Sequence, residues 1–322
     1  MDYTPKREDR LVRETTSIVF RGEEYRYVHS HYVEPNGECY TTTSLDEANF
    51  NQVYNQYRER YGIPYPDEIR DMLDKYGVSA SRMGAILGFG ENSISNYLDG
   101  EVPNKANGKV LAAIRKLAVF EAYVDNAREQ IGEKAYLKIK GRIAELEREE
   151  PDITSFIIFP KAERSIYNGF AAQSTKKVKD VILCALSRLG DTYKTKMNKI
   201  LFYIDMLSYR QRGYAITGLA YKAEQYGTIP YRSDKVYSLL DIPRSTYYDG
   251  DREFSPLHVD SDAVLVNISE DERKIIECVC DRFKGYTAAQ ISEENHKEQA
   301  WQKYKDTNKP IPFSEAFYLT QV

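Results

Sequence analysis

Short polar side chains are concentrated in one part of this sequence. Between two glycines, at positions 90 and 100, lie Glu91, Asn92, Ser93, Ser95 and Asn96. Asparagine can form two hydrogen bonds with the edge of an adenine, and serine can bond to a base edge or to a phosphate. These residue types suit hydrogen bonding to DNA, provided that a helix presents them on one outer face.

The residues around this stretch predict the helices that are needed. Ser79 is a suitable N-cap for a first helix, Gly88 permits a tight turn, and Gly100 ends a second helix. The apolar side chains that would hold both helices on a core are Met83, Ile86, Leu87, Ile94 and Tyr97. This order, with the small Gly84 where the helices meet, resembles the Xre/Cro type of helix-turn-helix, whose second helix enters the major groove.

The charge around these helices is balanced. From Asp67 to Lys116 there are seven basic and seven acidic residues. Arg82, Lys105 and Lys109 are the expected phosphate contacts. Because phosphate contacts supply most of the affinity for DNA, one copy is expected to bind an operator weakly, so we expect a homodimer that reads two half-sites. A helical hairpin in an ordinary core, or a helix-turn-helix adapted to protein contacts, is the alternative.

The region before these helices contains few residues that could bind a metal. Residues 14–43 alternate apolar and polar side chains around Gly22 and the turn sequence EPNGE, which predicts short antiparallel strands. The layout of strands, a helix and the helix-turn-helix is similar to the MqsA-like antitoxins, which usually carry zinc in the N-terminal unit. That site needs four ligands, and this region offers Cys39, His29 and His31. We therefore predict a unit that folds with no metal, and no cofactor.

The remaining patterns predict a mainly α protein with small β elements, an α+β fold. Ser44, Glu47 and Gly62 mark the start and the end of one helix, and Pro66 and Gly77 mark the next. Residues 125–150 are highly charged with sparse apolar side chains, which favours an exposed or connecting helix rather than a core element. The expected segments are a degenerate zinc-finger-like unit (1–62), the helix-turn-helix (63–124), a charged connection (125–173) and a helical domain (174–322).

Three stretches of the last segment resemble the Panacea domain of the SocA- and GepA-type proteins. They are MNKILFYIDMLSYRQRGYAITG, LAYKAEQYGTIPYR and SEDERKIIECVCDRFKGYTAAQISEENHKEQAW, in the family's order. The signature positions are Lys199, Gly213, Gly227, His296 and Trp301, to which we assign structural roles. Thr228 and Ile229 stand where the family commonly has proline and valine, and the loop 241–260 is longer than typical.

The resemblance implies an antitoxin that neutralises a cognate protein toxin by direct binding. Tyrosine is a frequent anchor residue in protein interfaces. We expect the anchors among Tyr209, Tyr226, Tyr231, Tyr247 and Tyr248, although Tyr203 and Tyr226 are also candidates for the core under the elbow formed by residues 219–231. The helix-turn-helix would then repress the operon that encodes both the toxin and this protein.

Two other functions compete with this one. The first is a DNA-binding regulator or phage accessory protein that has no toxin partner. The second is an enzyme that uses Glu293, Glu294 and His296 as acid and base, but no phosphate loop or nucleophile motif accompanies them. We interpret His296 as a structural histidine and predict that the chain is not an enzyme.

Composition excludes some classes. The net charge of -4 argues against a general nucleic-acid coat, and the sequence has no apolar run long enough to span a membrane. The four scattered cysteines favour a reducing compartment, and we expect the protein in the cytoplasm, with no membrane partner.

Overall fold

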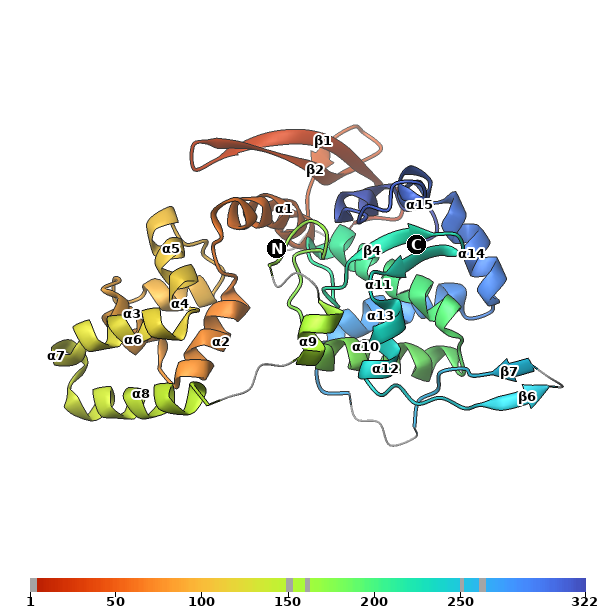
Figure 1. Cartoon of the computed structure of the whole chain (residues 1–322). Coiled ribbons are helices and arrows are strands. Elements are labelled where there is room, and N and C mark those ends of the chain that lie inside the picture. The colour runs from red at the N-terminus through yellow and green to blue at the C-terminus, as the bar shows by residue number, and fades with distance from the viewer. Residues whose placement is uncertain (1–4, 149–152, 160–162, 250–251, 261–264) are drawn as a thin grey trace. The chain divides into compact units, whose positions relative to one another are not determined.

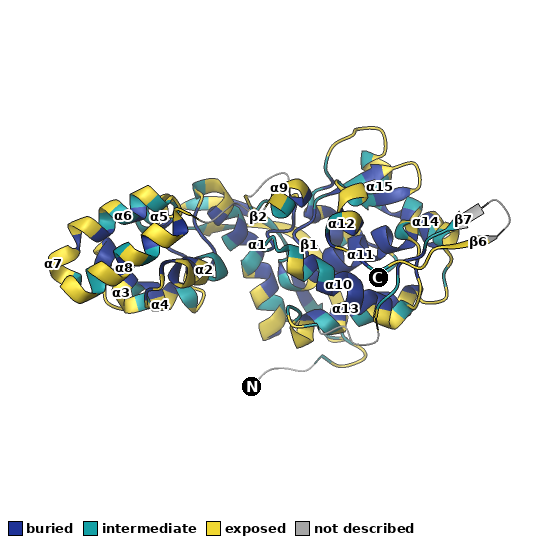
Figure 2. Ribbon diagram, turned by 60° about the horizontal axis from the view of Figure 1, so that its bottom comes forward, coloured by how far each residue is buried: buried dark blue, intermediate teal, exposed yellow. Residues whose placement is uncertain are grey.

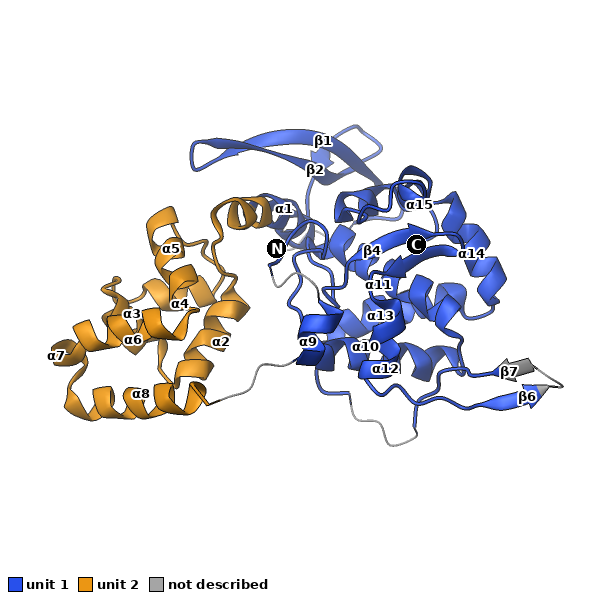
Figure 3. Ribbon diagram, in the orientation of Figure 1, with its two compact units in different colours: residues 1–53, 152–322 blue, residues 54–151 orange. Residues whose placement is uncertain are grey.

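The computed structural model describes residues 5–148, 153–159, 163–249, 252–260 and 265–322 (Figure 1). It confirms the α+β fold class. The chain forms two compact units: unit 1 contains residues 1–53 and 152–322, and unit 2 contains residues 54–151 (Figure 3). This division differs from the four expected segments, because the N-terminal strands group with the C-terminal helices, and residues 125–151 of the charged connection group with the helix-turn-helix.

The N-terminal sheet is a long hairpin with a short third strand. Strand β1 (Arg10–Phe20) pairs antiparallel with β2 (Glu23–Val33), and β3 (Cys39–Tyr40) pairs with the end of β2. Arg21 and Gly22 form the turn between the two long strands with φ of 51° and 82°. Positive φ at both turn residues matches the twist of paired strands, so this turn continues the ladder without splaying it.

Helix α1 (Thr43–Tyr61) follows the sheet and covers one edge of β2 with its side chains. The helix begins one residue before the expected cap at Ser44, and the hydroxyl of Thr42 accepts a hydrogen bond from the Leu45 amide at 3.3 Å. The side-chain amide of Gln52 donates to the Val28 carbonyl and accepts from the Val28 amide, both at 2.9 Å. Asn49 binds the amide and the carbonyl of Ser30 in the same way, at 2.9 and 3.0 Å.

Unit 2 is a cluster of helices around an apolar core. The helices after α1 are α2 (Pro66–Tyr76), α3 (Ala80–Leu87), α4 (Ser93–Leu98), α5 (Lys105–Ala113), α6 (Leu117–Asn126), α7 (Arg128–Ile131) and α8 (Glu133–Leu146). Helix α8 belongs to this core, because Ile139, Ile143 and Leu146 are buried in it. The expectation that this segment is not a core element was wrong, because the few apolar residues of α8 lie three or four positions apart and form one buried stripe.

In the rest of unit 1, helices surround the central helix α11 (Lys194–Arg212). The other elements are α9 (Ile153–Ile158), α10 (Thr175–Leu189), β4 (Tyr221–Glu224), β5 (Gly227–Pro230), α12 (Ser233–Leu239), β6 (Tyr247–Asp249), β7 (Arg252–Phe254), α13 (Glu270–Phe283), α14 (Ala288–Lys297), α15 (Gln299–Tyr304) and η1 (Phe313–Tyr318). Every residue of α11 from Lys196 to Tyr209 is buried (Figure 2). A helix that is buried on all sides must also bury its polar residues.

No helix in the described part of the chain is long and apolar enough to cross a membrane. The sequence also predicts a short strand or strand pair at 258–267, and residues 261–264 of this stretch lie outside the described residues. The long loop 241–260 contains the small hairpin β6–β7.

Candidate functional site

The hairpin β4–β5 and helix α14 pack closely around Gly227. This glycine has a φ of 100°, and a Cβ at its position would lie 2.7 Å from both the Asn295 Oδ1 and the Lys199 Cε atoms. Asn295 is fully buried, and its Oδ1 accepts a hydrogen bond from the Thr228 amide at 2.6 Å. Only glycine fits both this backbone conformation and this contact, which explains its place between two buried polar side chains.

Lys199 places an amino group inside unit 1. Its side chain is 1% exposed, and burial lowers its pKa to about 8. No ion pair connects it to a carboxylate in the described part of the chain. A lysine that lacks a carboxylate partner and is removed from water loses part of its preference for the charged form.

His296 and Trp301 join the C-terminal helices to the turn of the β4–β5 hairpin. Their rings lie 4.1 Å apart, and the Trp301 Nε1 donates to the Glu224 carbonyl at 2.9 Å. Burial, and next the charge of Lys199, lower the pKa of His296, so this imidazole is neutral at neutral pH. Glu294 forms an ion pair with Lys297 at 2.8 Å rather than with His296. The arrangement therefore suits a structural role, in which these two side chains hold the C-terminal helices to the β4–β5 hairpin, better than acid–base chemistry.

A second buried polar site is centred on Asp205 of α11. Its carboxylate accepts hydrogen bonds from the Ile216 and Thr217 amides at 2.9 and 2.8 Å and from the Tyr221 hydroxyl at 2.6 Å. The Thr217 hydroxyl also donates to it. Burial raises the pKa of Asp205, and these hydrogen bonds oppose that change. Asp205 thereby ties α11 to the chain that returns after Gly213 into β4.

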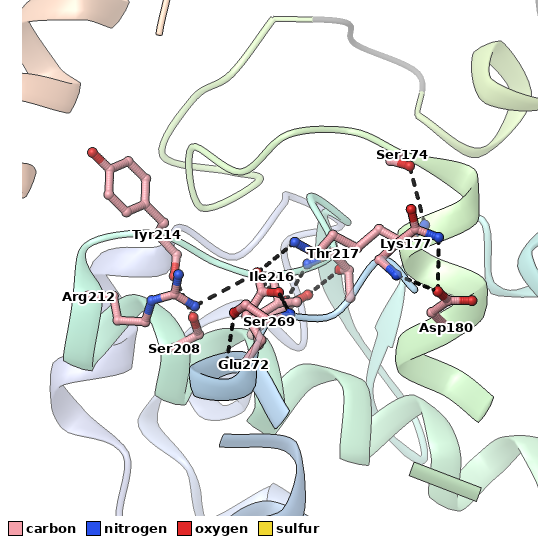
Figure 4. Close-up of polar contacts among 12 residues, drawn as sticks. Ser174, Lys177, Asp180, Ser208, Arg212, Tyr214, Ile216, Thr217, Ser269 and Glu272 are labelled. Atoms are coloured by element: carbon pink, nitrogen blue, oxygen red, sulfur yellow. Dashed lines mark hydrogen bonds and ion pairs between the residues drawn. The ribbon is translucent and has the colours of Figure 1, made fainter. Parts of the chain in front are cut away.

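Glu272 of α13 joins three helices on another side of α11 (Figure 4). It forms ion pairs with Lys177 of α10 at 2.6 Å and with Arg212 of α11 at 3.9 Å. Glu272 also completes a capping box with Ser269, in which each side chain accepts a hydrogen bond from the other residue's backbone amide. A serine followed three residues later by a glutamate predicts the start of a helix, but it does not indicate these ion pairs between helices.

Asp205 and Asn295, which are among the most buried polar residues of unit 1, were not among the predicted site residues. A signal for Asp205 is present: it is the one charged residue in the apolar run ILFYIDML of the sequence. Asn295 directly precedes the signature residue His296, and nothing in its neighbours indicates its burial.

The structure separates the five candidate tyrosines. Tyr226, at the turn between β4 and β5, is 67% exposed, and Tyr247 and Tyr248 on β6 are 50% and 70% exposed. Tyr231 is partly buried. Tyr209 is 4% exposed and contacts the rings of Phe170, Phe313 and Phe317, so its assignment as a surface anchor was wrong. Tyr203 is buried as one alternative expected, whereas Tyr226 is not in the core.

In unit 2, α3 has the caps that the sequence predicted, whereas the C-cap of α4 is Asp99, one residue before the expected Gly100. The Ser79 hydroxyl accepts from the Arg82 amide at 3.2 Å, and Gly88 has a φ of 69° at the end of α3. Ile94 and Tyr97 are buried under α4. The other face of this segment carries the candidate groove residues: Glu91, Asn92, Ser95 and Asn96 are exposed, and Ser93 is partly buried.

The three basic residues expected to contact phosphates differ in the contacts that they make within the protein. The Arg82 guanidinium donates to the Ile131 carbonyl at 3.2 Å. The Lys105 ammonium lies 4.1 Å from the centre of the Tyr61 ring. Lys109 is exposed on α5.

The candidate metal ligands do not form a complete set. The rings of His29 and His31 stack 5.1 Å apart on one face of β2, and Cys39 is exposed on β3. Within the residues that the structure describes, no three His, Cys, Asp or Glu side chains are grouped as a metal site would require.

A cavity of about 810 Å³ lies within unit 1, between the base of the N-terminal hairpin and helices α1, α11 and α13. Leu11 and Arg13 of β1 and Ser30 and Tyr32 of β2 line it from one face of the hairpin. That face of the hairpin base is therefore turned towards the rest of the unit.

Comparisons with known proteins agree with the C-terminal resemblance. Residues 197–302 match the family described as antitoxin SocA-like, Panacea domain. The searches of curated proteins and of solved structures found no match. A Panacea domain is thus present at 197–302, within the expected segment 174–322. The matched residues include Lys199, Gly213, Gly227, His296 and Trp301.

Proposed function

We propose that this protein is an antitoxin that neutralises a cognate protein toxin through its Panacea domain and represses its own operon through unit 2. The observation that carries this proposal is the match of residues 197–302 to a family of SocA-like antitoxins. The buried polar contacts around Gly227 and Asp205 support it, because they hold a rigid body on which surface side chains are fixed before binding.

Two exposed places on this body are candidates for toxin binding. Tyr226 projects from the tight turn between β4 and β5, and Trp301 and Asn295 fix the backbone on either side of that turn. Tyr247 and Tyr248 lie on β6, where the Tyr247 hydroxyl is 2.9 Å from the Tyr193 hydroxyl and the Tyr247 ring stacks on Phe254 at 5.3 Å. Aromatic anchors that are already ordered lose little entropy on binding.

The test of neutralisation is growth rescue by the full chain when it is expressed together with the short open reading frame beside its gene. We expect rescue by the parent and loss of rescue by Tyr226→Ala or by Tyr247→Ala/Tyr248→Ala. The matched control is Tyr318→Ala, which removes a tyrosine of 49% exposure outside the matched residues. A parent chain that fails to rescue, or fails to bind the purified product, would remove the antitoxin proposal.

The DNA-binding part of the proposal rests on the polar face of α4 and the residues before it. A homodimer would present two such faces to two half-sites, which compensates for weak binding by one copy. In a gel-shift assay with the promoter DNA, Asn92→Ala/Ser93→Ala/Asn96→Ala should weaken binding at least about 100-fold, since each lost pair with a base contributes about 1–3 kcal/mol. Asn126→Ala/Gln130→Ala, at exposed positions of the same unit, should bind as the parent does.

The same triple variant tests whether the two activities are separate. It should still rescue growth, because neutralisation is assigned to unit 1. The alternative function, a regulator or phage accessory protein with no toxin partner, predicts promoter binding in the parent and no toxic neighbouring product.

A further inference from the structure

The two long strands of the N-terminal hairpin differ in how their outer edges are covered. The outer edge of β2 is bound by β3 at one end and by the side chains of Asn49 and Gln52 in the middle. The outer edge of β1 is paired with no strand in the described part of the chain. An open edge of this length is a template for pairing with another strand.

The turn determines which backbone groups of β1 face outward. Phe20 and Glu23 close the two-residue turn, so they form a hydrogen-bonded pair, and the even-numbered residues of β1 are bonded to β2. The contacts of β2 agree, because the amides of Val28 and Ser30 are bonded away from β1. The outward N–H and C=O groups of β1 therefore belong to Leu11, Arg13, Thr15, Ser17 and Val19.

The sequence of β1 is complementary to itself about Thr15. If two copies pair antiparallel with Thr15 opposite Thr15, Leu11 lies opposite Val19 and Val12 lies opposite Ile18. Arg13 then faces Ser17, Glu14 faces Thr16, and Arg10 faces Phe20. No two like charges stand directly opposite each other, and each outward residue meets an outward residue, as an antiparallel ladder requires.

Exposure is consistent with this pairing. Leu11 is 36% exposed and Val19 is 70% exposed, although both are apolar and β-forming. Pairing would place each beside its counterpart in the second copy, where cross-strand apolar contacts stabilise a sheet. We infer that two copies of this chain associate through their β1 strands, antiparallel and centred on Thr15, into one continuous sheet.

This inference deepens the homodimer in the proposed function by naming its surface. It is measured with neither toxin nor DNA, so its failure would leave the neutralisation proposal as it stands. The first measurement is the molar mass of the full chain by light scattering over a dilution series, where we expect a dimer.

Charge variants then test the register. Thr15→Lys/Ser17→Lys places lysine opposite lysine at the centre and opposite Arg13 on either side, and it should raise the dimer dissociation constant at least about tenfold, as expected for opposed like charges. The control Thr16→Lys adds a charge on the same exposed strand, but opposite Glu14, and should leave the dimer intact. Circular dichroism of each variant checks that the fold is retained.

Cysteine cross-linking gives a second, geometric measurement. In a background with Cys39→Ser and Cys278→Ser, Thr15→Cys should form an interchain disulfide, because directly opposed Cα atoms are about 5.5 Å apart. Arg13→Cys and Ser17→Cys are the controls, since each would lie about 14 Å from its own copy at four residues of offset.

Three outcomes would overturn the inference. The first is a chain that is monomeric at every concentration. This result would also be expected if the β1 edge binds the toxin rather than a second copy. The second is a dimer that Thr15→Lys/Ser17→Lys leaves unchanged, and the third is equal cross-linking at positions 13, 15 and 17.

Discussion

The two units of this protein have different cores. In unit 2, the side chains buried between α2 and α8 are apolar or tyrosine, and the ring of Tyr76 stacks on Phe120 with the centroids 3.7 Å apart. In unit 1, the neighbourhood of α11 buries Lys199, Asp205, Asn295 and Glu298. Burying each of these four polar or charged side chains costs free energy unless hydrogen bonds or opposite charges compensate for the lost contact with water.

This difference indicates how each unit responds to substitution. An apolar core of suitable volume accepts many exchanges and retains its fold. A core of hydrogen-bonded polar groups depends on each partner, because one missing partner leaves another group buried and unsatisfied. We expect unit 1 to tolerate substitution less well than unit 2, and three substitutions test this contrast.

The largest effect is expected from Gly227→Ala. The new Cβ would lie 2.7 Å from Asn295 Oδ1 and Lys199 Cε, in a backbone conformation that favours glycine. We expect a loss of at least about 4 kcal/mol in the free energy of unfolding of unit 1, from combined overpacking and backbone strain. Fluorescence of Trp301, the single tryptophan of the chain, reports the transition in urea. Gly285→Ala, where the space is open, should behave as the parent, and equal stability of both variants would contradict this packing.

The second effect depends on pH. Lys199 has a folded pKa of about 8, below the ordinary 10.5, so between these values the unfolded chain keeps a proton that the folded protein has released. Stability therefore rises with pH across this range, and the cost of the buried charge is fully present at pH 7. Lys199→Met removes that cost, and its stability relative to the parent should fall by roughly 2 to 3 kcal/mol between pH 7 and pH 10. A difference that does not vary with pH would show that the amino group is not buried as described.

The smallest effect is expected in unit 2. The hydroxyl of Tyr76 donates to the Ile114 carbonyl at 2.5 Å inside the apolar core. Tyr76→Phe keeps the ring stack and loses this hydrogen bond, so we expect a loss of about 1 kcal/mol in the free energy of unfolding. Circular dichroism at several urea concentrations measures it, with the partly buried Tyr123→Phe as control. A loss as large as that of Gly227→Ala would erase the contrast between the units.

The apolar pattern of the sequence was sufficient to predict much of unit 2. The caps at Ser79 and Gly88 and the buried positions Ile94 and Tyr97 follow from local rules of helix ends and helix periodicity. The burial of helix α8 was not predicted, because the prediction rested on composition. A stripe of only a few apolar residues changes the composition of a highly charged segment very little. The burial of α8 depends on contacts with α6 and with α2, and α2 is distant in the sequence.

Unit 1 was harder to predict because its buried polar residues have partners that are distant in sequence. Asn295 and Thr228, or Asp205 and Tyr221, meet only once the chain is folded. Tyr209 was expected at the surface and is buried, whereas Tyr226 was a candidate for the core and is exposed. Contacts between distant parts of the chain decide both outcomes. Both are tyrosines in mixed surroundings, and their exposure depends on whether the segment lies at the centre of the unit, like α11, or at the turn of a hairpin.

The two amides that α1 presents to β2 are not interchangeable. Asn49 and Gln52 are three residues apart on a helix, a rise of about 4.5 Å, whereas Ser30 and Val28 are two residues apart on a strand, a rise of about 6.7 Å. The longer glutamine bridges this mismatch at one end and the shorter asparagine fits the other. Two side chains of unequal length therefore fix both the position and the direction of β2 along α1.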